Sequence, residues 1–442
     1  MFGTSGIRGP VGETVTADLA VDVGRAVATD DAECVLVARD ARESGGFLTD
    51  AVAAGLAECG ADVIDLGRVA TPTLARSIDR LGADAGVVVT ASHNPPPDNG
   101  LKLWTPSGQA FDADRRQRIT EIIDESAYAF AAWDDTGSRR RDSTAEKAHK
   151  AALIEAVDRE SIAGLDIVVD VGNGVGGVTA DALGALGAEV TTLNAQPDGA
   201  FPGRPSEPTA ETLTDLCAQV ANTDADVGIA HDGDADRMLA VDETGTFVPK
   251  DVLFGLFARH AVEQAGGGRV AAPVDTSLAV GDAVAEADGE MVRTKVGDVF
   301  VAEAASRPGA VFGGEPSGAW IWPDETLCPD GPLAACRLAE LVGSRRSLSA
   351  QVDSVESYPL YRENINVENK AAVLDRIAAD LDAEFDHVET TDGVRVETDD
   401  GWFLIRASGT QPLVRVTAEA RGDAVAKRLC EQAVKRVMAA QA

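Results

Sequence analysis

Residues 86–102 of the chain read GVVVTASHNPPPDNGLK. The short apolar run from Gly86 to Val89 predicts a strand, and a polar loop follows it at once. Runs of this kind alternate with amphipathic helical segments along the whole chain, which is typical of α/β layers. Open α/β sheets bind ligands beyond the carboxyl ends of their strands. Ser92 therefore stands where an α/β fold delivers side chains to a cleft.

The polar residues after this strand carry candidate chemistry. A serine hydroxyl such as that of Ser92 is a weak nucleophile unless a base or a cation activates it. His93 and Lys102 are nearby candidates for proton handling and charge neutralisation. The prolines at 95–97 stiffen the loop, and Asn99-Gly100 predicts a tight turn. A plain polar turn would explain an isolated Ser-His pair, but not a run this dense.

The remaining elements predict four units. In the first, strands and helices are expected at Cys34–Ala38, Ser44–Cys59, Asp62–Leu66, Thr71–Leu81 and Ala85–Thr90. In the polar stretch that follows, Arg139-Arg140-Arg141 is interpreted as a solvated turn, with an anion site as the alternative. The second unit opens with the strand Asp166–Val171, the third begins near Lys250, and the fourth near Tyr358. We expect three similar α/β domains (1–145, 146–249 and 250–352) and a C-terminal α+β domain (353–442) around a central cleft.

The loop His231-Asp232-Gly233-Asp234-Ala235-Asp236-Arg237 follows another apolar strand, Asp226–Ala230. Carboxylates at alternate positions can face one hard cation, and three such charges would repel one another without it. The pattern predicts a divalent metal held by Asp232, Asp234 and Asp236, with Arg237 able to reach a phosphoryl group beside it. An EF-hand fails because it requires glycine where Arg237 stands. A solvated acidic loop stays open as an alternative.

Two later loops are rich in hydrogen-bonding groups. Glu315 and Ser317 lie between glycines in residues 312–320, where the carboxylate could accept a pair of sugar hydroxyls; a simple turn is the alternative. The second loop offers a candidate phosphate cradle, with a hairpin loop as its alternative. Its residues are Arg406, Ser408, Gly409, Thr410 and Arg415.

The segment 172–177, Gly-Asn-Gly-Val-Gly-Gly, has the spacing of a dinucleotide-binding loop. Asn194 stands where the acidic residue that meets the ribose is expected. Close helix–strand packing is therefore the favoured interpretation of these glycines.

The charge of the chain argues against several classes of partner. Its 39 Lys+Arg and 73 Asp+Glu give a formal net charge of -34, which disfavours nucleic acid and anionic lipid. We favour adaptation to a cytoplasm of molar salt over ordinary solubility, because a Debye length of about 3 Å screens such self-repulsion. The sequence predicts no membrane span and no signal peptide, and therefore a cytoplasmic protein. The six cysteines form no C-x-x-C pair and are expected to be reduced.

In the same order along nearly the whole chain, these segments resemble the α-D-phosphohexomutase superfamily of phosphoglucomutases, phosphomannomutases and phosphoglucosamine mutases. The opening Phe2–Gly9 looks like the superfamily's N-terminal signature, which would place Arg8 near the catalytic serine. Thr294–Asp298 looks like a third-domain loop that touches substrate. Ala319 departs from the histidine of many bacterial members. In length and opening the chain is most similar to archaeal members of the phosphoglucosamine mutase type.

The resemblance implies a mechanism and a set of roles. Ser92 would carry the phosphoryl group and, with the three aspartates, hold one Mg²⁺ per subunit; Arg8, His93, Lys102 and Arg237 would assist the transfer. Residues 315–317 would read the sugar, and the loop from Arg406 to Arg415 would hold its phosphate. A sugar bisphosphate would be the intermediate and activator. We expect a monomeric or homodimeric isomerase acting on glucosamine phosphate; the alternatives are glucose, mannose or pentose phosphates, a sugar-phosphate phosphatase, or a non-catalytic sensor.

Overall fold

The computed structural model describes residues 2–3, 6–385, 388–408 and 413–441. Two compact units contain them. Unit 1 spans residues 1–253 and 317–352, and unit 2 spans residues 254–316 and 353–442. The predicted domain boundaries after residues 145, 249 and 352 stay predictions.

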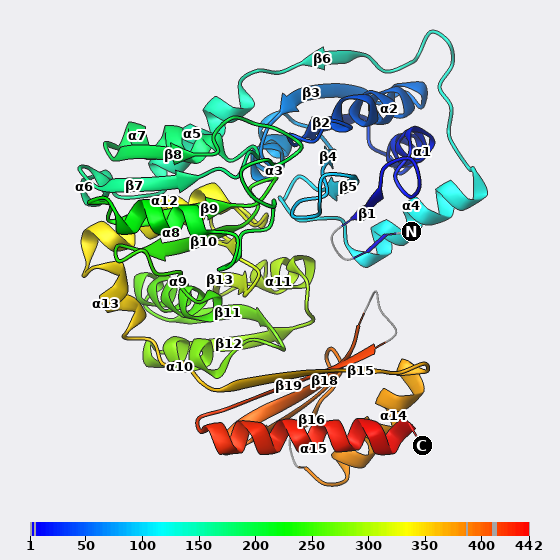
Figure 1. The fold of residues 1–442 in the computed structure, drawn as a ribbon. Helices are drawn as coiled ribbons and strands as arrows, with labels where there is room; N and C mark the ends of the chain where they lie inside the picture. Colours follow the sequence, from blue (N-terminus) through cyan, green and yellow to red (C-terminus); the bar gives the residue numbers. More distant parts are fainter. Residues whose placement is uncertain (1, 4–5, 386–387, 409–412, 442) are drawn as a thin grey trace. The chain divides into compact units, whose positions relative to one another are not determined.

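The first sheet of unit 1 has the strand order β1-β5-β4-β2-β3-β6 (Figure 1). Its strands are β1 (Ile7–Pro10), β2 (Cys34–Arg39), β3 (Asp62–Arg68), β4 (Ala85–Val89), β5 (Asp98–Trp104) and β6 (Arg139–Arg141). Its helices are α1 (Ala17–Thr29), α2 (Gly45–Glu58), α3 (Thr71–Arg80) and α4 (Ala113–Glu125). Strands β2, β3 and β4 are parallel, whereas β5 runs antiparallel to both β4 and β1.

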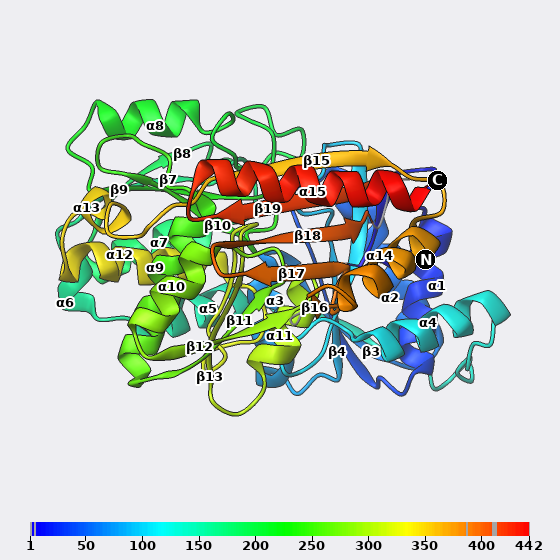
Figure 2. The ribbon, with the colours of Figure 1, turned by 90° about the horizontal axis from the view of Figure 1, so that it is seen from below.

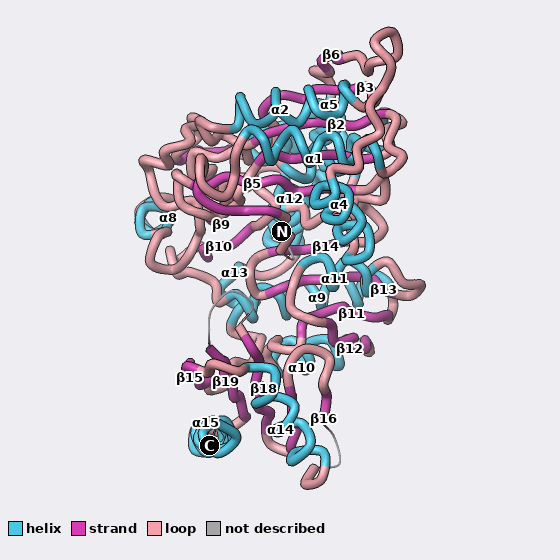
Figure 3. The backbone as a smooth tube through the Cα atoms, turned by 90° about the vertical axis from the view of Figure 1, so that its right-hand side faces the viewer, coloured by secondary structure: helices cyan, strands magenta, loops and turns pink. Residues whose placement is uncertain are grey.

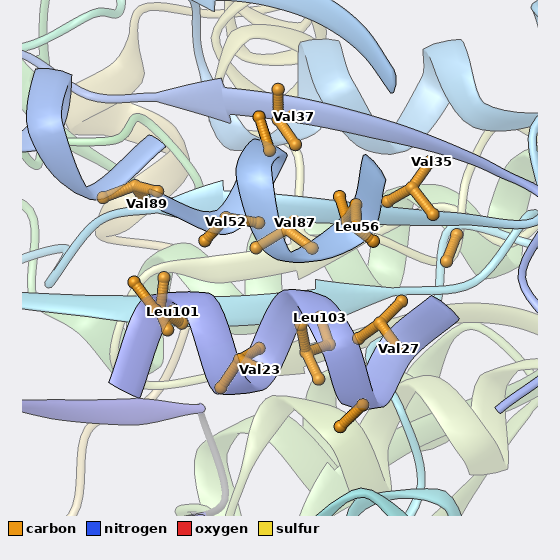
Figure 4. Close-up of a cluster of buried hydrophobic side chains, with 14 of the residues drawn as sticks. Val23, Val27, Val35, Val37, Val52, Leu56, Val87, Val89, Leu101 and Leu103 are labelled. Carbon is orange, nitrogen blue, oxygen red and sulfur yellow. The ribbon is translucent and has the colours of Figure 1, made fainter. Parts of the chain in front are cut away.

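Valine and leucine side chains from α1, α2 and the sheet make the core beside these strands (Figure 4). The two helices approach each other closely at Gly24 and Gly55. A Cβ atom on Gly24 would lie 2.3 Å from the carbonyl oxygen of Val52, and one on Gly55 would lie 2.1 Å from that of Val21. Any larger residue at either position would force the helices apart.

The second sheet of unit 1 has the order β10-β9-β7-β8, with β9 and β7 parallel and β10 antiparallel at the edge. Its strands are β7 (Asp166–Asp170), β8 (Glu189–Leu193), β9 (Val227–His231) and β10 (Met238–Asp242). The remaining elements of unit 1 are α5 (Ala145–Glu155), α6 (Arg159–Ile162), α7 (Gly177–Leu186), α8 (Thr214–Ala221), β14 (Ala319–Ile321), α12 (Gly331–Ser344) and α13 (Leu348–Val352). The helix α9 (Lys250–Ala265) begins in unit 1 and ends in unit 2.

Unit 2 contains a parallel group in the order β12-β11-β13 and an antiparallel sheet in the order β15-β19-β18-β17-β16. The first group comprises β11 (Gly268–Pro273), α10 (Leu278–Glu286), β12 (Gly289–Thr294), α11 (Asp298–Ala305) and β13 (Ala310–Glu315). The second comprises β15 (Leu360–Asn366), α14 (Lys370–Asp382), β16 (Val388–Glu389), β17 (Val394–Thr398), β18 (Gly401–Ala407), β19 (Leu413–Ala420) and α15 (Asp423–Gln441). Both α14 and α15 pack on one face of the antiparallel sheet, and α15 lies along β15 and β19 (Figures 2 and 3).

Buried polar contacts join the two parts of unit 2. The buried carboxylate of Glu419 accepts hydrogen bonds from the hydroxyl of Ser277, the backbone N–H of Leu278 and the indole N–H of Trp402. Arg395 stacks on the Trp402 ring and donates to the carbonyl oxygen of Val274 at 2.6 Å. The carboxylate of Glu419 thus accepts the first backbone N–H of α10, and the Ser277 hydroxyl accepts the next one, from Ala279.

Two local predictions are wrong. Asn99 and Gly100 do not form a tight turn: both lie in β5, opposite Gly9 and Arg8 of β1. Residues 139–141 are not a turn but the exposed edge strand β6, parallel to β3. Across the described residues, every helix is too short or too polar to cross a membrane.

Candidate active site

Ser92 lies in the loop that follows β4, and its side chain is fully buried. Its hydroxyl donates a hydrogen bond to Asp232 Oδ2 at 2.7 Å, and its backbone N–H donates to the hydroxyl of Thr90 at 2.9 Å. Its φ of 52° falls in the left-handed region, which a residue with a Cβ atom rarely adopts. Strained conformations of this kind persist only where the surrounding structure imposes them, and they cluster at functional sites.

The reversal of the chain into β5 brings two cations to the same edge of the sheet. Lys102 lies on β5 opposite Val88 of β4, and β1 places Arg8 opposite Gly100. A Cβ atom on Gly100 would lie 2.2 Å from the carbonyl oxygen of Ile7, so β1 can pair here only against glycine. Glycine is therefore needed at position 100 because the backbone of β1 approaches it closely.

The three aspartates follow β9 and converge on the serine. One oxygen atom from each of Asp232, Asp234 and Asp236 lies within 4.8 Å of the others, and all three side chains are buried. Lys102 Nζ lies 2.7 Å from Asp234 Oδ2 and 2.5 Å from Asp236 Oδ2. The structure thus brings a predicted nucleophile, a predicted cation and the predicted acidic loop into one buried cluster.

Burial and charge set the protonation of this cluster. Desolvation, together with the charges of Asp236 and Asp234, raises the pKa of Asp232 well above its usual value. Burial also acts to raise the pKa of Asp234, but the ammonium group of Lys102 outweighs it and lowers that pKa below its usual value. Burial and the charge of Asp234 raise the pKa of Asp236. Burial and mutual repulsion thus outweigh the nearby cations at Asp232 and Asp236, but not at Asp234.

The two candidates for proton handling differ in charge. Burial and the nearby guanidinium groups of Arg237 and Arg8 lower the pKa of His93 to about 2, which keeps its imidazole neutral. Burial acts against the charge of Lys102, but Asp234 and Asp236 raise its pKa above the usual value. Lys102 therefore carries a positive charge beside the aspartates.

The carboxylates fit a hard divalent cation. Asp234 Oδ1 and Asp236 Oδ1 are buried and have no hydrogen-bond partner among the described residues. Unpaired buried carboxylate oxygens are costly, and a cation with oxygen ligands satisfies them. Together with the raised pKa of Asp232, this donor set suggests a metal-binding loop.

Several residues that sequence reasoning missed hold this loop in place. His231, fully buried, accepts or donates at both ring nitrogens: Nε2 lies 2.8 Å from the Thr179 hydroxyl and Nδ1 lies 2.9 Å from the Arg237 carbonyl oxygen. Because Nδ1 faces a carbonyl, it carries the proton. Thr71 donates from its hydroxyl to Asp234 Oδ2 at 2.6 Å. These polar side chains lie at or near the ends of strands and helices. Their position could have marked them as candidates only if the loops that carry them were already known to meet around the acidic loop.

The glycines of residues 172–177 pack against the same loop. A Cβ atom on Gly174 would lie 2.6 Å from the carbonyl oxygen of Gly233, and one on Gly176 would lie 2.9 Å from the ring of His231. This segment is thus a packing surface for the acidic loop.

The other predicted residues divide between the units. Ser317 belongs to unit 1, and Ala319 forms a bridge with Arg237 there. In unit 2, Glu315 Oε1 accepts the backbone N–H of Gly297 at 2.7 Å. Gly409 and Thr410 lie outside the described residues.

The predicted phosphate loop of unit 2 shares a carboxylate with the 294–298 loop. Arg406 pairs with Asp392 at 3.2 Å, and the same Asp392 oxygen accepts the backbone N–H of Val296 at 3.0 Å. Arg415 of β19 lies opposite Arg406 of β18, and the buried Ser408 comes directly after β18. Asp392, which the sequence did not single out, therefore links two loops that were predicted to touch substrate.

The site combines a buried serine, an acidic cluster, arginines and a lysine. This set of side chains is typical of enzymes that transfer phosphoryl groups. Models of the phosphoglucomutase/phosphomannomutase family match four consecutive stretches. These are the alpha/beta/alpha domains I (residues 1–129), II (147–245) and III (249–358), and the C-terminal domain (363–436).

Proteins that are similar to this chain over its full length support the same family. A protein of Methanopyrus kandleri described as "Probable phosphoglucosamine mutase" is 46% identical over 98% of this chain and 96% of its own. One of the same description from Methanothermobacter thermautotrophicus is 43% identical, with the same coverage. The crystal structure of a phosphoglucomutase/phosphomannomutase family protein from Burkholderia thailandensis has a TM-score of 0.89 and 30% identity over 100% of this chain and 98% of that one.

The chain belongs to the phosphoglucomutase/phosphomannomutase family. Its predicted fold class, three α/β domains followed by a C-terminal domain, is confirmed, as is the predicted class of enzyme, a phosphohexomutase.

Proposed function

We propose that the protein interconverts glucosamine 6-phosphate and glucosamine 1-phosphate by way of a phosphoserine at residue 92. The observation that carries this proposal is the buried Ser92 hydroxyl, fixed 2.7 Å from Asp232 within the acidic cluster. The names of the archaeal relatives at 43–46% identity support glucosamine as the sugar. Ala319, where many bacterial members have histidine, makes the sugar the point most in need of a test.

In the proposed reaction, a free hydroxyl of the sugar monophosphate attacks the phosphorus of phosphoserine 92. The new O–P bond forms as the bond to Ser92 Oγ breaks; the sugar hydroxyl loses its proton and the serine oxygen gains one. The resulting bisphosphate turns end over end and returns its other phosphoryl group to Ser92. This sequence interconverts the isomers without net consumption of phosphate.

The residues around Ser92 have separate roles in this proposal. Asp232, Asp234 and Asp236 would hold Mg²⁺ together with Ser92, and the ion supplies positive charge where charge develops on the phosphoryl group. Lys102, which is paired with Asp234, and Arg8, which lies opposite Gly100, would add positive charge near the serine. Arg237 lies beside Asp236 of the acidic loop. His93 is neutral, whereas Lys102 carries a positive charge.

We assign recognition of the rest of the substrate to the other predicted loops. Glu315 and Ser317 would bind sugar hydroxyls. Arg406, Ser408, Gly409, Thr410 and Arg415 would bind the phosphate at the far end. Because the bisphosphate must bind in both orientations, we expect the site around Ser92 and the loop from Arg406 to Arg415 each to bind either of its two phosphates.

The substrate is tested by measuring isomerisation of glucosamine, glucose, mannose and pentose phosphates in molar KCl with Mg²⁺ and a trace of sugar bisphosphate. We expect kcat/KM for glucosamine phosphate to exceed the others by at least about tenfold, since glucose and mannose phosphates carry a neutral hydroxyl where glucosamine carries a charged ammonium group, and hydrogen bonds to a charged group are the stronger ones. Preference for glucose or mannose phosphate would instead make the protein a general phosphohexomutase. Release of inorganic phosphate without isomer would indicate a phosphatase.

The charge predicts a dependence on salt, which we propose reflects a cytoplasm rich in KCl. With a net charge of -34, self-repulsion should destabilise the folded chain in dilute buffer and be screened at molar salt. We expect Tm in molar KCl to exceed that in low salt by about 10 °C or more, which corresponds to several kcal/mol. Differential scanning fluorimetry measures it, with equimolar sucrose as the non-ionic control. An equal Tm in both buffers would contradict the halophilic interpretation.

A further inference from the structure

Arg42 is one of the most deeply buried charged residues of unit 1, with 1% of its surface exposed. It lies in the connection between β2 and α2, outside the segments that the family resemblance singled out. Its guanidinium group donates hydrogen bonds to four carbonyl oxygens of the loop that contains the nucleophile. They belong to Ser92 (2.9 Å), Asn94 (2.6 Å), Pro95 (2.7 Å) and Asp98 (2.8 Å).

A second chain of contacts holds the other side of Ser92. Asp40 accepts hydrogen bonds from Arg42 Nε at 3.1 Å and from the Thr90 hydroxyl at 2.7 Å. The Thr90 hydroxyl in turn accepts the backbone N–H of Ser92 at 2.9 Å. The peptide groups before and after Ser92 are therefore both tied to one buried ion pair, Asp40–Arg42.

The carbonyl oxygens of Asn94 and Pro95 each accept one further hydrogen bond, from the Ser206 hydroxyl and from the backbone N–H of Asp98. Arg42 supplies the remaining donors, which the loop lacks for two reasons. Residues 95–97 are prolines, which have no N–H and cannot pair with neighbouring carbonyls. In addition, Ser92 has a positive φ, which is unfavourable for a residue with a Cβ atom. A planar guanidinium with five N–H donors can serve several converging carbonyls at once, whereas a lysine ammonium has three donors on a single atom.

We propose that Arg42 is a positioning residue for the reaction at Ser92. It fixes the loop backbone so that the serine oxygen stays aligned with the acidic cluster, and it takes no part in bond making. The proposal rests on the proposed function only in that Ser92 carries the phosphoryl group. The Phe201 ring, 5.1 Å from the guanidinium carbon, covers Arg42 and helps to fix its plane.

The test is Arg42→Lys, which keeps the charge and most of the length but loses the planar set of donors. The readouts are kcat, KM and the single-turnover rate at which phosphorylated enzyme transfers its group to a sugar monophosphate. We expect kcat and the transfer rate to fall about a hundredfold, since a displacement of about 1 Å at a nucleophile costs that much. KM should change by less than about threefold, because Arg42 touches the nucleophile loop and not the substrate.

Arg395→Lys is the matched control. Arg395 is equally buried, and it also donates to a backbone carbonyl and pairs with a carboxylate, but it belongs to unit 2 and not to the unit that contains Ser92. We expect this variant to lower Tm about as much as Arg42→Lys while kcat stays within about twofold of the parent. If Arg42→Lys lowers kcat no more than Arg395→Lys at a similar loss of Tm, Arg42 is merely structural and the proposal is overturned.

A second variant covers the case in which Arg42→Lys does not fold. Asp40→Asn leaves the arginine in place but removes the charge that orients it, and kcat should fall about tenfold with KM little changed. An unchanged kcat in Asp40→Asn would overturn the proposal. Intact-mass measurement of the parent enzyme after treatment with a sugar bisphosphate tests the proposed function separately from the role of Arg42. If the parent carries no phosphate on Ser92, both proposals are wrong. A phosphorylated but inactive Arg42→Lys supports the positioning role.

Discussion

Replacing Ser92 by alanine should lower kcat by at least about ten-thousandfold, the scale of loss seen when a nucleophile is removed. The hydroxyl oxygen is the only non-hydrogen atom that the change deletes, and it is the atom that lies 2.7 Å from Asp232 Oδ2. Alanine keeps the Cβ atom, so the left-handed backbone at this position gains no new strain. We expect far-UV circular dichroism to be unchanged, Tm to shift by only a few degrees, and no phosphate to appear on the protein after treatment with a sugar bisphosphate.

Ser77→Ala is a suitable control for this experiment. Ser77 is as well buried, but its hydroxyl donates to the Thr73 carbonyl oxygen within α3 and lies outside the cluster around Ser92. This variant should keep kcat within about twofold of the parent. Substantial isomerisation by Ser92→Ala would rule out a covalent intermediate on this residue and with it the proposed mechanism.

The sequence predicted the strands that carry the site because their apolar runs are short and are followed at once by polar loops. β4 and β9 both end in such loops, but they belong to different sheets, so only the family resemblance placed Ser92 beside Asp232. Where a strand lacks an apolar run, the pattern has nothing to detect. Arg139, Arg140 and Arg141 form β6 only because the edge of β3 offers free backbone groups.

Asn99-Gly100 shows why local turn propensity misled the sequence reasoning. The pair is typical of a hairpin turn, but here tertiary pairing with β1 decides its conformation, and glycine is needed for the approach of a neighbouring backbone. Arg42 and His231 were missed for a related reason. Apart from Asp40, which pairs with Arg42, their partners are backbone carbonyls and the Thr179 hydroxyl, which leave no mark in sequence spacing. Asp40 and Arg42 do stand just after a strand, and that position alone could have marked them as neighbours of the nucleophile.

Asp232→Asn should have opposite effects on stability and on function. Because burial and like charges raise the pKa of Asp232, the folded metal-free protein holds a proton there more tightly than the unfolded chain does. Stability is therefore lost as the pH rises from the ordinary aspartate pKa towards the raised one, and the ionised carboxylate is a cost at higher pH. Asparagine removes that cost, so Tm of the metal-free protein should rise by about 2 to 5 °C.

The same substitution should remove the response to metal. At a free Mg²⁺ concentration of about a hundred times its Kd, binding to the folded parent adds about 2.7 kcal/mol to the free energy of unfolding. This raises Tm by about 5 °C. Asp232→Asn should lose most of this rise, and its kcat should fall by about a thousandfold or more because the charge that stabilises phosphoryl transfer is no longer held in place. Thermal melts with EDTA and with Mg²⁺, run beside activity assays, measure both effects.

Asp242→Asn is the control that distinguishes the loss of a buried carboxylate charge in general from its loss within the acidic cluster. Asp242 is also buried and ends β10, but its Oδ1 accepts hydrogen bonds from Thr244 and Thr246, so its carboxylate is already satisfied. This variant should not gain stability without metal, and its Mg²⁺-dependent rise in Tm should match that of the parent. If Asp232→Asn instead melts lower than the parent in EDTA and still responds fully to Mg²⁺, the acidic loop is not the metal site. The three carboxylates would then be neutralised by Lys102 and by protons alone.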